Sequence, residues 1–176
     1  KNEIICLQKT KDNEKEEGNM SGYFKKKERS DMQENYVNKE TVEEVLKLQS
    51  KDVPERNIRK EILEKFNVKV AVSEQDGKTP IAIYFPSYNQ KGKIVGYSKQ
   101  DLTKPKEEKG HWSCVGSVSI NNKLFGQQLA EQQNRKRNNL TITEGQWDCI
   151  SVYQALVDNV KGTKFEGIEP LVVSIP

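Results

Sequence analysis

The order of apolar and polar residues divides the last part of the chain into a strand, a helix and a second strand. Residues 140–143 form a short run with β-branched side chains, which is typical of a buried strand. Farther on, apolar residues recur at alternating steps of three and four, as on one face of a helix. These positions are Ile150, Tyr153, Val157 and Val160. Residues 171–175 are again apolar except for Ser174, so the pattern predicts a β-α-β unit.

Two short helices are predicted upstream. Thr41-Val42-Glu43-Glu44 has the form of a capping box, in which the threonine hydroxyl and the glutamate carboxylate satisfy backbone donors, so a helix is expected to start at Thr41. A second helix is expected after Pro54, and Asn67 is placed to end it in the left-handed conformation. Its apolar face would consist of Ile58, Ile62, Leu63 and Phe66.

The period changes to that of strands after residue 68. Asp76-Gly77 and residues 89–92 are turn signals between apolar runs, which predicts an antiparallel meander. The expected strands are residues 69–72, 81–85 and 93–97, with a further strand near 111–115. Residues 124–129 are expected to pack behind this sheet, and a basic stretch, 135–139, leads into the β-α-β unit. The predicted fold class is therefore α+β.

Composition divides the chain further. The first 40 residues carry many charges and few apolar side chains, which predicts a linker or tail, followed by one subdomain at 41–138 and another at 139–176. No apolar run approaches the roughly 20 residues that span a bilayer, and no signal-peptide pattern opens the chain, so we expect an intracellular protein without a membrane partner. A net charge of +3 is too small to identify a nucleic-acid binder.

The three cysteines, Cys6, Cys114 and Cys149, are widely spaced and form no CxxC pair. This spacing excludes a cysteine-based zinc site and argues against a disulfide framework.

The candidate chemistry begins with Glu144, which directly follows the first strand of the β-α-β unit. Ligands bind at the carboxyl ends of parallel strands, and Gly145 would let the chain turn tightly beside a metal or phosphate. Asp148 lies four residues after Glu144, a spacing that brings side chains to one side of a helix. The alternative role for Glu144, capping the helix that begins near Gln146, is compatible with this one.

The segment ITEGQWDCISVYQAL, followed by VVSIP, resembles the first half of a TOPRIM domain, the fold shared by primases and by type IA and II topoisomerases. Upstream, GKIVGYSKQDL, KGHWSCVGS and LFGQQLA resemble the segment that precedes TOPRIM in phage-type primase-helicases, the group that includes Twinkle. The resemblance runs from about residue 57 to residue 176. It implies an antiparallel-sheet, RNA-polymerase-like primase module followed by the first β-α-β of a Rossmann-like TOPRIM domain, truncated within that domain.

For chemistry, the resemblance implies synthesis of short RNA primers on a single-stranded DNA template from nucleoside triphosphates, with Mg²⁺ or Mn²⁺. Glu144 would be the metal-linked acid-base group and Asp148 a second acidic ligand. Gln146 stands where relatives often have a glutamate, which lowers the expected metal affinity. No Asp-x-Asp motif follows Ser174, so we expect that this chain does not make primers alone.

Four lysines are candidates for binding nucleotide or template: Lys99, Lys104, Lys106 and Lys109. The match is imperfect at Lys99, because the family's Lys-x-Arg step reads here as Ser98-Lys99-Gln100, and an offset of one residue moves a side chain to the opposite face of a sheet. The neighbouring Glu107 and Glu108 also fit a solvated loop, and both interpretations stay open.

Aromatic residues give a further pair of alternatives. His111 and Trp112 could stack a template base, or strand alternation could place Trp112 in the core and His111 in solvent; the second interpretation is favoured. Tyr84, Tyr88 and Tyr97 are expected to pack.

Two other functions remain open: a non-catalytic TOPRIM-like module that binds nucleic acid, or part of a TOPRIM nuclease or topoisomerase. Many relatives continue into a hexameric ATP-driven helicase, but this sequence has no Walker A motif. The family implies the cytoplasm of a phage-infected host or an organelle matrix or stroma.

Overall fold

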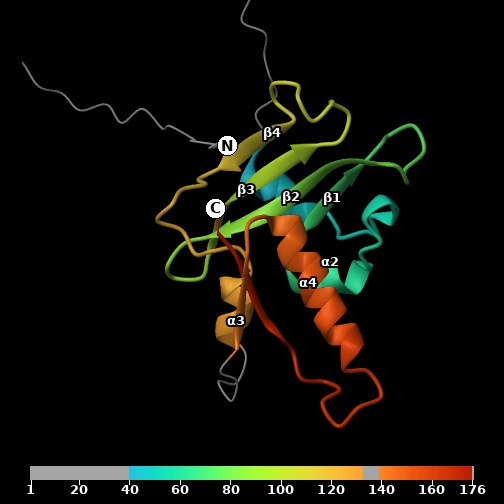
Figure 1. Cartoon of the computed structure of the whole chain (residues 1–176). Coiled ribbons are helices and arrows are strands. Elements are labelled where there is room, and N and C mark those ends of the chain that lie inside the picture. Colours follow the sequence, from blue (N-terminus) through green and yellow to red (C-terminus); the bar gives the residue numbers. More distant parts are fainter. Residues whose placement is uncertain (1–39, 133–138, 176) are drawn as a thin grey trace, which may run out of the picture. The chain divides into compact units, whose positions relative to one another are not determined.

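Two sheets organise the computed structural model, which describes residues 40–132 and 139–175 (Figure 1). The antiparallel sheet has the strand order β1 (Lys69–Val72), β2 (Pro80–Tyr88), β3 (Ile94–Asp101) and β4 (Trp112–Gly116). The second sheet is the parallel pair β5 (Leu140–Thr143) and β6 (Leu171–Ser174). The predicted meander and the α+β class are confirmed. The predicted linker, up to residue 39, and residues 135–138 of the basic stretch lie outside the described residues.

The helices are short except for the one that joins β5 to β6. They are α1 (Val42–Lys47), the 3₁₀ helix η1 (Pro54–Arg56), α2 (Lys60–Lys65), α3 (Gln127–Gln132) and α4 (Gln146–Asn159). Within the described ranges, no helix is both long enough and apolar enough to cross a lipid bilayer.

The predicted capping box is present. Thr41 Oγ1 accepts from the Glu44 amide at 3.3 Å, and Glu44 Oε2 accepts from the Thr41 amide at 2.8 Å, so the two residues satisfy each other at the start of α1. The helix expected after Pro54 is different. Pro54 begins only η1, which is capped by Asn57 in the left-handed conformation (φ 52°), and α2 begins at Lys60.

The reason for this difference is a local bridge between Val53 and Ile58, which folds the chain back and turns the apolar side chain of Ile58 into the core. Asparagine adopts the left-handed conformation more readily than most residues. Asn67 takes it at φ 54°, as predicted, directly after α2.

The two faces of the antiparallel sheet have separate cores. On one face, the rings of Tyr84 and Tyr97 pack edge to face, with their centres 6.3 Å apart, and Val45 of α1 covers them. The other face is covered by α2 and α4 (Figure 1), and Ile83 and Phe85 belong to the core between them. The expectation that Tyr84 and Tyr97 serve packing is confirmed.

The second of these cores crosses the predicted subdomain boundary near residue 138. It joins Phe85 of the antiparallel sheet to Ile150 and Tyr153 of α4 and to Val172 of β6. β6 is buried, as predicted, but β5 is not: Leu140 is 54% exposed and Ile142 is 60% exposed. Leu140 and Ile142 are two positions apart and therefore share one face of the β5–β6 pair, and the described residues leave their side chains uncovered there.

An ion pair ties α2 to α4. Arg59 donates to both carboxylate oxygens of Asp158, at 2.8 and 2.9 Å, and this fork lowers the pKa of Asp158 to about 2. Because both side chains are about one third exposed, the pair orients the helices more than it stabilises them.

The buried Tyr153 hydroxyl finds no hydrogen-bond partner in the part of the chain that the structure describes. Replacing Tyr153 with phenylalanine should leave the free energy of unfolding unchanged or raise it by up to about 1 kcal/mol, because an unpaired buried hydroxyl is costly. Ile150→Ala, one turn away in the same core, should lower it by about 2–5 kcal/mol. Urea denaturation measures both, and a marked loss of stability in Tyr153→Phe would contradict this assignment.

Candidate functional site

Glu144 and Gly145 are the only two residues between β5 and α4. β5 and β6 run parallel, with Leu140 opposite Leu171 and Thr143 opposite Ser174. Glu144 therefore lies directly after the carboxyl end of a parallel strand, where the sequence placed it.

The turn is held by the last residue of β5. The Thr143 hydroxyl lies 3.3 Å from the Gly145 carbonyl oxygen and 3.2 Å from the Val173 carbonyl oxygen, and its single O–H can donate to either of them. The Thr143 carbonyl accepts from the Ile175 amide at 3.0 Å, and the Gly145 carbonyl accepts the first hydrogen bond of α4 from Cys149 at 3.0 Å. The backbone on both sides of Glu144 is thus fixed.

The two carboxylates at this turn are exposed. The part of the chain that the structure describes supplies neither a hydrogen bond nor an ion pair to Glu144 or Asp148, and the N-cap residue of α4 is Gly145. The alternative role for Glu144, as the cap of this helix, is therefore wrong. Both carboxylates are available to a ligand from solution.

Gly145 has a different role from the one predicted. Its φ of −136° and ψ of 157° are extended values that any residue adopts, so the turn itself does not require glycine. A Cβ at this position would lie 3.3 Å from Asp148 Oδ2. The missing side chain instead leaves room for the Asp148 carboxylate to fold back over the turn that carries Glu144.

Residues for a metal ion are few. No group of three or more His, Cys, Asp or Glu side chains arranged for a metal lies within residues 40–132 and 139–175. Glu144 and Asp148 offer hard carboxylate oxygens, which suit Mg²⁺ or Mn²⁺, and the Gln146 amide is a neutral oxygen ligand in the same turn. A cation here would need further ligands, such as phosphate oxygens or water.

The candidate lysines do not gather around Glu144. Lys99 pairs with Tyr84 and Ser113 in the sheet and lies on the face covered by α1. Its Nζ is 2.8 Å from Glu40 Oε1 and 5.5 Å from the centre of the Tyr84 ring. The adjacent Gln100 is on the face that carries α4, as the offset of one residue predicts.

The other three lysines lie in the connection between β3 and β4. Lys104 Nζ is 3.9 Å from Asp101 Oδ2, whereas Lys106 and Lys109 are exposed. Their predicted contact with nucleotide or template stays a prediction.

His111 is not in solvent, so the favoured interpretation of this residue is wrong. It is 5% exposed, with Nε2 3.0 Å from Gln100 Nε2 and Nδ1 2.9 Å from the Lys104 carbonyl oxygen. The strand begins one residue later, at Trp112, so the alternation rule does not reach His111. Trp112 is partly buried and packs against Phe85 at 5.9 Å, as expected for a residue facing the core.

Sequence reasoning missed three residues beside the turn. The Trp147 indole Nε1 donates to Gln100 Oε1 at 2.7 Å, and the Trp147 ring packs edge to face on Phe85 at 5.1 Å. The Arg56 guanidinium lies 5.2 Å from the centre of the Trp147 ring. Arg56 and Trp147 are 91 positions apart in the sequence, and Gln100 and Trp147 are 47 apart. No local signal links such distant positions.

Cys149 lies under the turn but has no part in its chemistry. Burial raises the pKa of its thiol to about 12, opposed only by the Thr143 hydroxyl, so a thiolate does not form at neutral pH.

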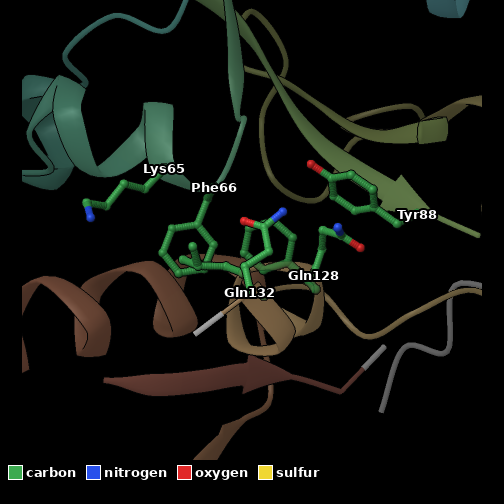
Figure 2. Close-up of a pocket in the computed structure, with 8 residues that line it drawn as sticks. Lys65, Phe66, Tyr88, Gln128 and Gln132 are labelled. Carbon is green, nitrogen blue, oxygen red and sulfur yellow. The ribbon is translucent and has the colours of Figure 1, made fainter. Parts of the chain in front are cut away.

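A cavity of about 130 Å³ lies elsewhere, between α2, α3 and the end of β2. Figure 2 shows Phe66 with the polar side chains of Lys65, Tyr88, Gln128 and Gln132 around it. None of the predicted site residues lines it, and the Tyr88 hydroxyl already accepts from Asn67 at 3.3 Å.

No family model matches the sequence, and a search of curated proteins finds no significant match. Solved structures that are similar in fold include three primase structures. The primase fragment of the bacteriophage T7 primase-helicase is 21% identical, over 72% of this chain and 43% of that chain, with a TM-score of 0.49. The E. coli primase catalytic core is 15% identical, over 69% and 45%, with a TM-score of 0.46. A DnaG primase catalytic domain bound to single-stranded DNA is 15% identical, over 69% and 45%, with a TM-score of 0.45. This chain spans less than half the length of each.

Gly145→Ala should fold normally, with a cost below about 1 kcal/mol, because its backbone is in an ordinary region and only the helix cap is weakened. The matched control is Gly126→Ala. Gly126 has φ +85°, and a Cβ there would lie 2.4 Å from the Val172 carbonyl oxygen, so this variant should lose about 3 kcal/mol or more. Thermal unfolding of the two variants measures the difference, and equal losses would contradict the account of Gly145.

Proposed function

We propose that this chain carries the first part of the catalytic core of a DNA primase of the phage primase-helicase type, which makes short RNA primers on single-stranded DNA. One observation carries the proposal. Within the TOPRIM-like sequence ITEGQWDC, Glu144 presents an exposed carboxylate at a rigid two-residue turn between a parallel strand and the first turn of α4.

The electrostatics of this turn favour a nucleotide together with a cation. The N-terminus of α4 carries a positive partial charge and free amides, which attract phosphate and disfavour a bare cation. The Glu144 and Asp148 carboxylates add two negative charges beside it. A divalent cation bound to a triphosphate would suit both the helix N-terminus and the carboxylates. The backbone amides would bind phosphate oxygens, and the two carboxylates would bind the cation.

In this proposal, a Mg²⁺ or Mn²⁺ ion held by Glu144 and Asp148 would offset the charge of the triphosphate, while a primer 3′-hydroxyl attacks the α-phosphorus and pyrophosphate leaves. Glu144 helps to hold the cation and accepts the hydroxyl proton, and Asp148 is a further ligand. The Asp148 carboxylate can approach because Gly145 has no side chain.

The lysines between β3 and β4 are proposed contacts for the phosphates of template or nucleotide. Lys106 and Lys109 are exposed. Exposed lysine ammonium groups suit contacts with backbone phosphates, which carry no sequence information. A nucleic-acid role for Lys99 would require its ion pair with Glu40 to open. The proposed partners are single-stranded DNA, nucleoside triphosphates and a hexameric helicase domain in the same parent chain, and the proposed location is an intracellular compartment.

A second candidate function is a non-catalytic module that binds nucleic acid. Two observations favour it: Gln146 replaces a charged ligand with a neutral one, and the described residues supply no third acidic ligand.

Paramagnetic broadening by Mn²⁺ tests the proposal. In the presence of a nucleoside triphosphate, Mn²⁺ should selectively broaden the amide signals of Glu144, Gly145 and Asp148, because the ion would be bound beside them. Glu144→Gln should remove most of this broadening. Glu43→Gln is the matched control, since Glu43 is an exposed glutamate in the first turn of α1.

Broadening that is uniform, or that survives in Glu144→Gln, would refute a metal site at the turn. If the chain then still bound single-stranded DNA in EDTA, the binding module would be the better account.

A further inference from the structure

A chain of three side chains connects the lysine loop between β3 and β4 to the first turn of α4. The Lys104 carbonyl contacts His111 Nδ1 at 2.9 Å, His111 Nε2 contacts Gln100 Nε2 at 3.0 Å, and Gln100 Oε1 contacts Trp147 Nε1 at 2.7 Å. Gln100 is 4% exposed and His111 is 5% exposed, so water does not compete for these bonds.

The direction of every bond in this chain is fixed by its two ends. The indole of Trp147 can only donate, so Gln100 must present its oxygen to Trp147 and its NH₂ group to His111. His111 Nε2 must then accept, which leaves Nδ1 to carry the proton and donate to the Lys104 carbonyl, which can only accept. Only the neutral Nδ1–H form of His111 satisfies all of these groups.

Trp147 places one end of this chain of hydrogen bonds beside the candidate site. Trp147 is the second residue of α4, three residues after Glu144 and one before Asp148. Its ring is packed on Phe85, and the hydrogen bond to Gln100 fixes which edge of the indole points into the core, so the side-chain torsions of Trp147 are set and the first turn of α4 is held with them. At the other end, Lys104 belongs to the loop that carries Lys106 and Lys109.

We propose that Gln100 and His111 are positioning residues that set the Glu144–Gly145 turn through Trp147 and couple it to the lysine loop. The effect on metal and nucleotide rests on the proposed function, whereas the coupling of the loop to the turn does not. A protonated His111, or its other tautomer, places an N–H against the Gln100 NH₂ group and breaks the chain of bonds at its centre.

Three variants separate this role from simple packing. Trp147→Phe keeps an aromatic ring on Phe85 but removes the indole donor. Gln100→Glu keeps an acceptor for Trp147 but cannot donate to His111, so His111 must place a proton on Nε2. Trp112→Phe is the matched control for packing: Trp112 also packs on Phe85, lies opposite Gln100 in the sheet and has its ring centre 6.1 Å from that of His111, but its indole makes no hydrogen bond to the described residues.

NMR of the ¹⁵N-labelled protein at neutral pH reads each step. We expect His111 in the Nδ1–H tautomer in the unmodified protein, and a proton on its Nε2 in Gln100→Glu. Trp147→Phe should shift the amide signals of Glu144 and Gly145 and weaken Mn²⁺–nucleotide affinity about tenfold, whereas Trp112→Phe should leave both unchanged.

The tautomer of His111 in the unmodified protein tests the proposal without any variant. A proton on His111 Nε2 would overturn it. Unmoved Glu144 and Gly145 amides in Trp147→Phe would do so as well. Absence of Mn²⁺ binding in the unmodified protein would refute the proposed function but not the coupling, because the tautomer and the amide shifts are measured without metal.

Discussion

The packing of α4 on the antiparallel sheet is the constraint on which the site depends. The ring of Phe85, in the middle of β2, packs against three other aromatic rings. The distances between ring centres are 5.9 Å to Trp112 of β4, 5.8 Å to Phe125 and 5.1 Å to Trp147 of α4. Aromatic rings bury large areas in defined geometries, so this cluster fixes the angle at which α4 meets the sheet. Because Trp147 is in the first turn of α4, the same cluster fixes where Glu144 emerges. The antiparallel sheet and the parallel β5–β6 pair therefore together fix the position of the Glu144–Gly145 turn.

The two faces of the sheet are used differently. On the face under α1, the polar side chains bind one another. Glu40 Oε1 lies 2.8 Å from Lys99 Nζ and accepts a hydrogen bond from the Tyr84 hydroxyl at 3.1 Å. The face under α4 buries Gln100 and His111 but leaves Glu144 and Asp148 in solvent. Groups that orient the turn are thus satisfied internally, whereas groups that could act on a ligand are left uncommitted. Such a division suits a preorganised site, because the carboxylates need no internal partner to be displaced.

The sequence was informative wherever the signal is local. The strand at 69–72, the capping box at Thr41 and the carboxylate after β5 each depend on neighbouring residues, and all three were predicted at the right positions. The rule that an offset of one residue reverses the face of a strand also holds here, because Lys99 and Gln100 face opposite sides of the sheet.

Prediction failed where distant segments decide the outcome. The Val53–Ile58 bridge shortens the helix after Pro54, and His111 is buried because Gln100 and a loop carbonyl bind it, not because of strand alternation. Gly145 was identified as a turn residue for its backbone, but its backbone is ordinary, and its missing side chain matters because Asp148 lies close to that position. The link between Gln100 and Trp147 joins residues far apart in the chain, which no periodicity reveals.

The central claim is that the Glu144 turn holds a divalent cation together with a nucleotide. The most direct measurement is a crystal structure of the chain soaked with Mn²⁺ and a nucleoside triphosphate, with anomalous data collected for manganese. The account predicts one strong anomalous peak about 2.1 Å from a Glu144 carboxylate oxygen, with triphosphate density at the N-terminus of α4. Manganese bound elsewhere, with the Glu144 carboxylate bonded only to protein groups, would contradict it.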